Sequence, residues 1–300
     1  MRSKFHYQER IRVLVVPTFF IVALGLLSFG LFSARSLDAE SGIVEMALDH
    51  GSIDWSNGVI RAIGLGVPPD NAVNATHAHE MAKRAGRVVA LRNLLEIVEG
   101  IHVDSHTLVK NYMVESDTIN TKVQGLVHGA RVTEEKALPD GSYQVTVEMK
   151  VSGDFQRTVL PAREHEPDPL KIVAQAASNV GSRSSDILIY TGLIVDAQGL
   201  DVQQTLAPKL LMEDGRVVYG SEWVDPEVIQ QTTVVAYVNN IPSAKTHQRV
   251  IAAPLVVRAL RVDESNPSDL VISDADAQTL HGIPEHVSFL KKAKVLVVLK

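Results

Sequence analysis

The sequence predicts an α+β protein, with an N-terminal membrane helix followed by two small α/β domains. The first domain is expected to pack an alanine-rich helix on an antiparallel sheet. An uncharged apolar stretch at Val13–Phe32, alanines at helical spacing within Asn71–Glu99 and a strict polar–apolar alternation in Tyr143–Val151 support this prediction. The expected organisation is a cytoplasmic leader and signal-anchor at 1–35, a first domain at 45–160, a linker at 161–185 and a second, mixed α/β domain at 186–300.

The stretch from Val13 to Phe32 is the first expected element. At about 1.5 Å per helical residue it is long enough to cross the ~30 Å hydrocarbon core of a bilayer. Four cations precede it, against the single acidic residue Glu9: Arg2, Lys4, Arg10 and Arg12. A positive leader keeps the N-terminus in the cytoplasm. The sequence therefore predicts a single-pass membrane protein, with the bulk of the chain on the far side of the membrane from the cytoplasm.

A cleaved signal peptide is the alternative interpretation of this stretch. The apolar region of a signal peptide usually has 7–15 residues and ends at a small-x-small cleavage site. The present stretch is longer, but Ala34-Arg35-Ser36 is a usable site. Both interpretations export the rest of the chain, and they differ in whether it stays attached to the membrane.

Composition indicates a folded, exported protein. Hydrophobic residues make up 45% of the chain and charged residues 21%, which fits globular domains. The absence of cysteine excludes disulfides, thiolate catalysis and a lipid-modified N-terminal cysteine. The net charge of −6, without a basic run, argues against nucleic acid as a partner. It also gives no electrostatic reason to bind an anionic membrane surface.

The first domain is expected to begin with a partly helical connector over residues 35–50 and one strand over Asp54–Gly66. A helix is predicted over Asn71–Glu99, with Gly100 ending it. Its small-residue face is expected to lie close against the sheet and consists of Ala75, Ala78, Ala82, Ala85 and Val89. A shorter helix is expected after Asp104 or Ser105 as N-cap.

A β-hairpin is predicted over Val123–Val151. The returning strand places Tyr143, Val145, Val147, Met149 and Val151 on one face. The turn at Pro139-Asp140-Gly141 supplies a glycine that can adopt φ > 0. The apolar face is expected to lie under the alanine-rich helix.

The second domain is expected to contain several short strands, a hairpin around Glu213-Asp214-Gly215 and two helices. The strands are predicted within residues 187–199, 232–238, 254–262, 270–272 and 293–300. The helices are predicted at Pro226–Gln231 and at Asp274–Leu280, the latter capped by Ser273.

Several segments of the first domain resemble a known family. These are Trp55–Pro69 (WSNGVIRAIGLGVPP), Leu91–Glu96, Glu99–Val103, Val123–Ala130 and Tyr143–Val147. In this order they resemble the Lpp-type twenty-kilodalton outer-membrane lipoprotein family and the similar N-terminal module of flagellar assembly protein T. The resemblance covers residues of about 52–155. It implies an envelope protein without known catalysis.

The chain departs from the lipoproteins in its expected mode of attachment. Those proteins are anchored by an acylated cysteine, whereas an uncharged spanning stretch takes that place here. With this departure, the resemblance implies a single-pass protein of the bacterial inner membrane, with the bulk of the chain in the periplasm, in place of outer-membrane attachment. A flagellar role is one option, because the module also occurs in envelope proteins with no flagellar link. The stretch Thr191–Leu200 and the ending of the chain, residues 293–300, resemble the C-terminal part of longer members of the same family.

No catalytic, cofactor or metal site is predicted from the residues. His77 and His79 lie on different faces of a helix, and His102 and His106 have usable i, i+4 spacing but no third ligand. Asp274-Ala275-Asp276 fits a helix start better than a calcium loop. The Gly64-Leu65-Gly66 sequence lacks the third glycine of a dinucleotide fingerprint, and no GxSxG motif is present.

Two functions of different classes follow as expectations. The first is a non-enzymatic structural or assembly module that binds copies of itself and other envelope proteins. Such a module would be an accessory of a flagellar or another envelope machine. The second is a periplasmic module that binds a small ligand or lipid. Exposed sheet edges would favour the first, and a concave apolar pocket with a few polar groups would favour the second.

Overall fold

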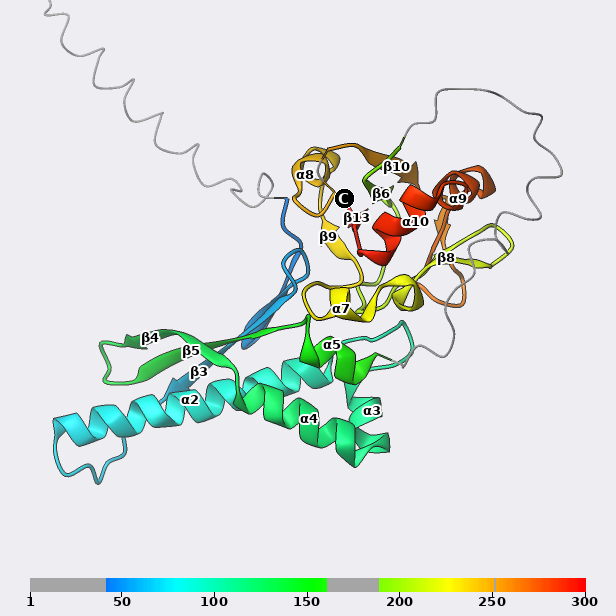
Figure 1. Cartoon of the computed structure of the whole chain (residues 1–300). Helices are drawn as coiled ribbons and strands as arrows, with labels where there is room; N and C mark the ends of the chain where they lie inside the picture. The colour runs from blue at the N-terminus through cyan, green and yellow to red at the C-terminus, as the bar shows by residue number, and fades with distance from the viewer. Residues whose placement is uncertain (1–41, 161–188, 251) are drawn as a thin grey trace, which may run out of the picture. The chain divides into compact units, whose positions relative to one another are not determined.

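The computed structural model describes residues 42–160, 189–250 and 252–300 (Figure 1). Residues Gly42–Lys300 form one compact unit. The predicted anchor at Val13–Phe32 and the predicted linker at 161–185 lie outside the described residues. Within the described ranges, no helix combines the length and the apolar character needed to span a bilayer.

The first half of the unit is a five-stranded antiparallel sheet covered by a long helix. The sheet order is β1 (Glu45–Leu48), β2 (Gly51–Asp54), β3 (Val59–Gly66), β5 (Tyr143–Lys150) and β4 (Arg131–Ala137). Helix α2 (Ala75–Glu99) packs on β3 and β5 (Figure 1). Asn74 caps α2 by accepting a hydrogen bond from the backbone N–H of His77, and Gly100 ends it. The prediction of an alanine-rich helix on an antiparallel sheet is confirmed.

The buried face of α2 differs from the predicted one. Ala82 is buried as expected, but Gly86, Ala90 and Leu94 continue the face one turn at a time. The reason lies on β3, where a Cβ added to Gly64 would lie 2.1 Å from the backbone nitrogen of Ala90. The backbones of strand and helix therefore touch, and the residues of α2 that fit this contact are those spaced four apart.

Two predictions near the start of the sheet are wrong. Residues 45–48, expected in a partly helical connector, form strand β1. The single strand predicted over Asp54–Gly66 is two strands, β2 and β3, joined by a turn. Gly58 in that turn has a φ of +64°, a conformation that β-branched and bulky residues avoid.

The predicted hairpin is confirmed in its returning strand and wrong in its first strand. Val123 lies in helix α4 (Asp117–His128), and β4 starts only at Arg131. Ser116 caps α4, and Val123 and Val127 are buried one helical turn apart, so their spacing serves a helix as well as a strand. The preceding helix α3 (Val109–Glu115) begins after Leu108. The predicted cap Asp104 instead accepts hydrogen bonds from the backbone N–H groups of His106 and Thr107.

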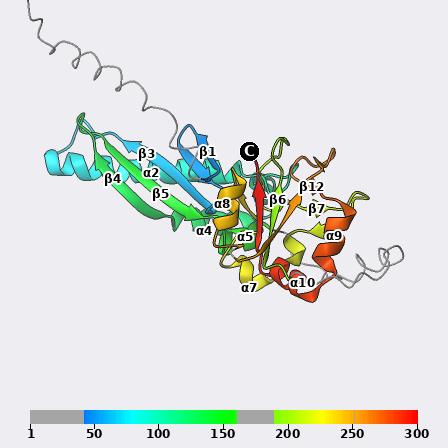
Figure 2. The same ribbon diagram turned by 90° about the horizontal axis from the view of Figure 1, so that it is seen from above.

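The second half contains a four-stranded parallel sheet in the order β10 (Pro254–Arg258), β6 (Gly192–Asp196), β13 (Val295–Val298) and β9 (Ala236–Val238). Figure 2 shows β6 and β13 within this half. Every residue of β13 is buried, which is typical of strands covered on both faces. Helix α8 (Ile241–Thr246) packs against β6, β9 and β13, and α10 (Pro284–Lys291) packs against β6.

A second small sheet has the order β11 (Arg261–Val262), β12 (Leu270–Val271), β7 (Leu210–Leu211) and β8 (Val217–Tyr219). The hairpin predicted around Gly215 joins β7 to β8 and is confirmed. Helix α9 (Asp274–His281) is capped by Ser273 as predicted. The single strand predicted over 254–262 is wrong, because β10 and β11 belong to different sheets. Within the described residues, the remaining helices are α5 (Asp154–Val159), η2 (Ser221–Trp223) and α7 (Pro226–Ile229).

Candidate functional site

The histidine pair with metal-ligand spacing does not form a helical site. His102 and His106 lie in the irregular segment between α2 and α3, and His106 Nε2 is 2.6 Å from the carbonyl oxygen of Ser265. His102 forms an isolated bridge with Leu108. Across the described residues, no group of three or more histidines and carboxylates lies close enough to hold a metal ion.

The other histidines and carboxylates weighed as ligands make contacts that stabilise the fold. His79 packs edge-on against Tyr143, with ring centroids 4.8 Å apart, while the Nδ1 atom of His77 accepts a hydrogen bond from the backbone N–H of Val73. The carboxylate of Asp276 accepts a hydrogen bond of 2.7 Å from the Ser273 hydroxyl. The Asp274 carboxylate accepts one from the backbone N–H of Glu213, so both carboxylates serve the start of α9.

A short segment before β1 pairs with the edge of the parallel sheet. Residues Gly42–Val44, which we call the clasp, run antiparallel to β9 through a bridge between Ile43 and Val238. The side-chain amide of Asn239 donates to the carbonyl oxygen of Ile43 at 3.2 Å. The buried hydroxyl of Ser56 accepts from the backbone N–H of Val44 at 2.8 Å and donates to the carbonyl oxygen of Tyr237. The clasp thus joins the two halves.

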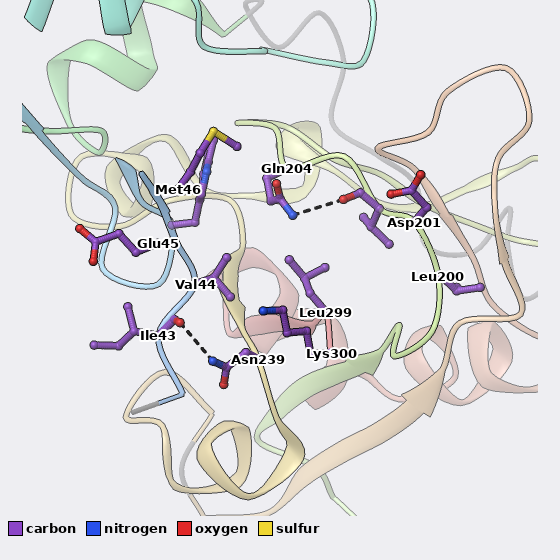
Figure 3. A pocket seen from close by; sticks show the side chains of 12 residues that line it. Ile43, Val44, Glu45, Met46, Leu200, Asp201, Gln204, Asn239, Leu299 and Lys300 are labelled. Carbon is purple, nitrogen blue, oxygen red and sulfur yellow. Dashed lines mark hydrogen bonds between the residues drawn. The ribbon is translucent and has the colours of Figure 1, made fainter. Parts of the chain in front are cut away.

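A cavity of about 400 Å³ lies beside the clasp (Figure 3). Its lining includes the residues directly after β9 and β13 and the segment from Leu200 that follows β6, which places the cavity at the carboxyl ends of the parallel strands, where ligands of open α/β sheets bind. Figure 3 shows Val44 and Leu299 among the labelled side chains. The lining residues are Ile43, Val44, Glu45, Met46, Trp55, Leu200, Asp201, Val202, Gln204, Asn239, Leu299 and Lys300.

Trp55 is an unusual member of this lining. It is 6% exposed, and its indole N–H has no hydrogen-bond partner among the described residues. Its ring packs edge-on against Tyr237, with centroids 5.9 Å apart. A buried donor without a partner is destabilising by about 1–3 kcal/mol, so such groups call for a specific explanation. Sequence reasoning missed this residue, because its burial depends on strands that lie far away along the chain.

The two edges of the antiparallel sheet are built differently. Edge strand β4 carries Arg131, Glu134, Glu135 and Lys136, and its register with β5 shifts after Val132. Charges and bulges of this kind prevent an edge from pairing with other strands. The other edge, β1, has one charge, no register shift, and exposed side chains at Met46 and Leu48. Among the described residues β1 pairs with β2 alone.

The buried titratable groups of the second half hold elements together. The guanidinium of Arg249 donates to the carbonyl oxygens of Thr233 at 2.9 Å and Ala293 at 3.2 Å. Burial lowers the pKa of Arg249 to about 10. Burial raises the pKa of Tyr237, whose hydroxyl donates to the carbonyl oxygen of Thr205 at 3.1 Å. Burial lowers the pKa of His281, which packs against Trp223 with ring centroids 4.6 Å apart.

Comparison with known proteins concerns the second half of the chain. Residues 192–300 match the family described as Treponema pallidum Tp0624, second domain. No curated protein matches the chain. The family match does not extend to residues 52–155, where the resemblance to Lpp-type lipoproteins and flagellar assembly protein T stays a prediction. From β6 to its last residue, the chain is therefore similar to a bacterial domain.

Proposed function

We propose that this chain is a non-enzymatic, membrane-anchored periplasmic protein that works by assembly, with the β1 edge as the contact between copies. The contrast between the two sheet edges carries the proposal. One edge is protected by four charged residues and a register shift, whereas the other presents Met46, Ala47 and Leu48. Unprotected strand edges pair readily with other strands.

The alternation of backbone hydrogen bonds along β1 determines which N–H groups are available to pair with a second copy. The backbone N–H of Trp55 donates to the carbonyl oxygen of Val44 at 2.9 Å. Because bonding alternates along an antiparallel pair, the N–H groups of Glu45 and Ala47 point away from β2. Two β1 strands that pair antiparallel through these groups would form a two-fold symmetric dimer with one continuous sheet.

Attachment to the inner membrane would assist this assembly. Confinement to a plane raises the effective concentration of the copies, so weak contacts can build a larger structure. Other envelope proteins, of a flagellar or another machine, fit the same proposal as partners. The resemblance of residues 52–155 to envelope proteins supports this setting.

A single substitution tests the proposed edge. Ala47→Pro removes an outward N–H group while the inward bonds of Met46 and Leu48 remain possible. The full-length protein in mild detergent is expected to be a dimer by light scattering, and Ala47→Pro is expected to be monomeric. Ala47→Ser, which keeps the N–H group, is the matched control and should stay dimeric. A wild-type protein that stays monomeric at micromolar concentration would contradict the proposal.

The cavity beside the clasp favours a second candidate function, the binding of a small ligand or lipid. Its supporting observation is the buried Trp55 N–H group, which offers a donor to a ligand with a hydrogen-bond acceptor. Native mass spectrometry tests this alternative. A stoichiometric bound molecule that is lost in Trp55→Phe, which keeps an aromatic ring and removes the N–H, would favour it over assembly.

A further inference from the structure

The solvent-facing side of α2 concentrates positive charge. Residues 81–95 include Lys83, Arg84, Arg87 and Arg92 and contain no aspartate or glutamate, and the exposed Glu80 and Glu96 border this run on the same face of α2. The chain as a whole carries a net charge of −6. An average over the chain therefore conceals a local basic surface on the longest described helix.

Three of these cations differ from the other arginines of the described chain. The other arginines of the described chain either lie near carboxylates or, like Arg249, donate hydrogen bonds to backbone carbonyl oxygens. The paired ones are Arg61, Arg131, Arg157, Arg216, Arg258 and Arg261. Lys83 pairs with Glu135 at 2.6 Å. In the described chain, Arg84, Arg87 and Arg92 are exposed and lie near no carboxylate within ion-pair distance.

Apolar side chains lie between these arginines. Met81 is 40% exposed and Val88 is 56% exposed. With 3.6 residues per turn, Met81, Arg84, Val88 and Arg92 share one face of α2. That face lies opposite the buried Ala82 and Gly86. We call these four residues and Arg87 the basic stripe.

The mixture of the two side-chain types identifies the partner. Guanidinium groups bind phosphate oxygens with charge-assisted hydrogen bonds. Apolar side chains between cations are typical of helices that lie at the headgroup boundary of a bilayer, where they contact acyl chains. A purely polyanionic partner would satisfy the arginines but would leave Val88 in contact with polar groups.

We infer that the basic stripe of α2 docks on an anionic phospholipid surface. This inference is independent of the β1 edge and of the proposed dimer. It assigns a second, reversible membrane contact to a chain whose predicted anchor lies before residue 35.

The absence of native cysteine permits a direct test on the full-length protein. Val88→Cys provides one site for a nitroxide spin label. The labelled protein is reconstituted in phosphatidylcholine vesicles with or without phosphatidylglycerol, and collision with a polar nickel chelate is measured. We expect phosphatidylglycerol to protect the label at position 88, and high salt to reverse the protection by screening. Ala275→Cys, on the exposed side of α9, is the control label and should be equally accessible in both vesicles.

Charge variants then distinguish the effect of the basic stripe from the effect of the net charge of the protein. The triple variant Arg84→Gln, Arg87→Gln and Arg92→Gln is expected to lower the equilibrium constant for docking about 100-fold. Each cation near an anionic surface raises this constant roughly fivefold. A matched triple variant with the same loss of charge, Arg157→Gln, Arg216→Gln and Arg261→Gln, should dock like the wild type.

Three results would overturn the inference. The first is equal accessibility of position 88 in the two vesicle types, and the second is unchanged docking of the α2 triple variant. The third is protection of position 88 in detergent without phospholipid, which would assign the stripe to a protein partner.

Discussion

Gly66 shows how a single residue determines the packing of the first half. A Cβ at this position would lie 1.9 Å from the carbonyl oxygen of Ala82 and 2.3 Å from the nitrogen of Gly86. Both atoms are backbone atoms and cannot rotate away. We expect Gly66→Ala to lower the free energy of unfolding by about 3 kcal/mol, measured by urea denaturation of residues 42–300.

Gly125 provides the matched control for this substitution. It lies in α4, and a Cβ there would have no atom within 4 Å. Alanine is the better helix former, so Gly125→Ala should leave the free energy of unfolding unchanged or raise it by up to ~1 kcal/mol. Equal effects of the two substitutions would contradict the close contact between β3 and α2.

His281 is expected to make the protein less stable in acid. Burial lowers its pKa below the ordinary value of 6.5, although the hydrogen bond of 2.8 Å to the carbonyl oxygen of Val218 opposes this shift. The unfolded chain therefore binds a proton at higher pH than the folded chain does. The contribution of His281 to the free energy of unfolding is fully present above about pH 6.5. It is lost as the pH falls towards the lower pKa of the folded state.

The variant His281→Gln removes this proton linkage. Urea denaturation at about pH 7 and pH 5 should show a smaller loss of stability in the variant than in the wild type. His247, whose pKa is also lowered by burial and by Arg249, accounts for part of the remaining loss. An unchanged loss in His281→Gln would assign the acid sensitivity to other groups.

At the residue scale, the sequence predicted some core positions and missed others. Ala82 was predicted because alanine at helical spacing indicates a close helix–sheet contact. Gly86 and Ala90 were missed, because several sets of small residues on α2 have equally regular spacing. Only the position of Gly64 and Gly66 on β3 selects among these sets, and that is a tertiary contact.

The clasp is the element on which the connection between the two halves depends. Ser56→Ala would leave the backbone N–H of Val44 and the carbonyl oxygen of Tyr237 without this hydroxyl. We expect the free energy of unfolding to fall by about 1–3 kcal/mol. Limited proteolysis near Gly42–Met46 should also become faster, because the segment is released from β9.

The exposed Ser265→Ala is the control for this experiment. Its hydroxyl bonds only to the nearby Asp263 in the described structure, and its effect should stay within ~0.5 kcal/mol. If proteolysis near the clasp proceeded at the same rate in both variants, the Ser56 hydroxyl would not be holding the segment.

At the element scale, strongly periodic segments were predicted well. Strand β5 follows from its alternation and from the turn that contains Gly141. The apolar residues of Val123–His128 fit both the helical and the strand period, so the sequence does not distinguish helix α4 from the predicted strand. Strand β1 was missed, since a four-residue strand with exposed side chains has no periodic signal of its own.

The topology of the whole molecule is testable with reporter fusions. Four cations before Val13–Phe32 predict that everything after the anchor is periplasmic. A phosphatase fused after Lys300 is therefore expected to be active in intact cells. An inactive phosphatase together with an active cytoplasmic reporter at the same position would reverse the orientation. A mature protein that begins at Leu37 would replace the anchor with a cleaved signal and leave export unchanged.

At the scale of the whole molecule, sequence could predict the mixture of helices and strands but not their pairing. The apolar run at Val295–Val298 indicates a buried strand, yet nothing in it specifies the neighbours β6 and β9. The cavity was also beyond prediction, because its lining combines residues 43–55 with residues 200–204, 239 and 299–300.

The clasp also constrains the order in which the chain can reach its native state. Ser56 and Tyr237 are 181 residues apart, and Ile43 and Asn239 are 196 apart. Closing loops of this length is slow, and residues 42–44 are synthesised long before β9 exists. The central strand β13 is made later still. A nascent chain that stalls before Val295 would therefore leave β6 and β9 without the strand that pairs with both of them, and their exposed apolar edges would make the incomplete chain a target for chaperones and proteases.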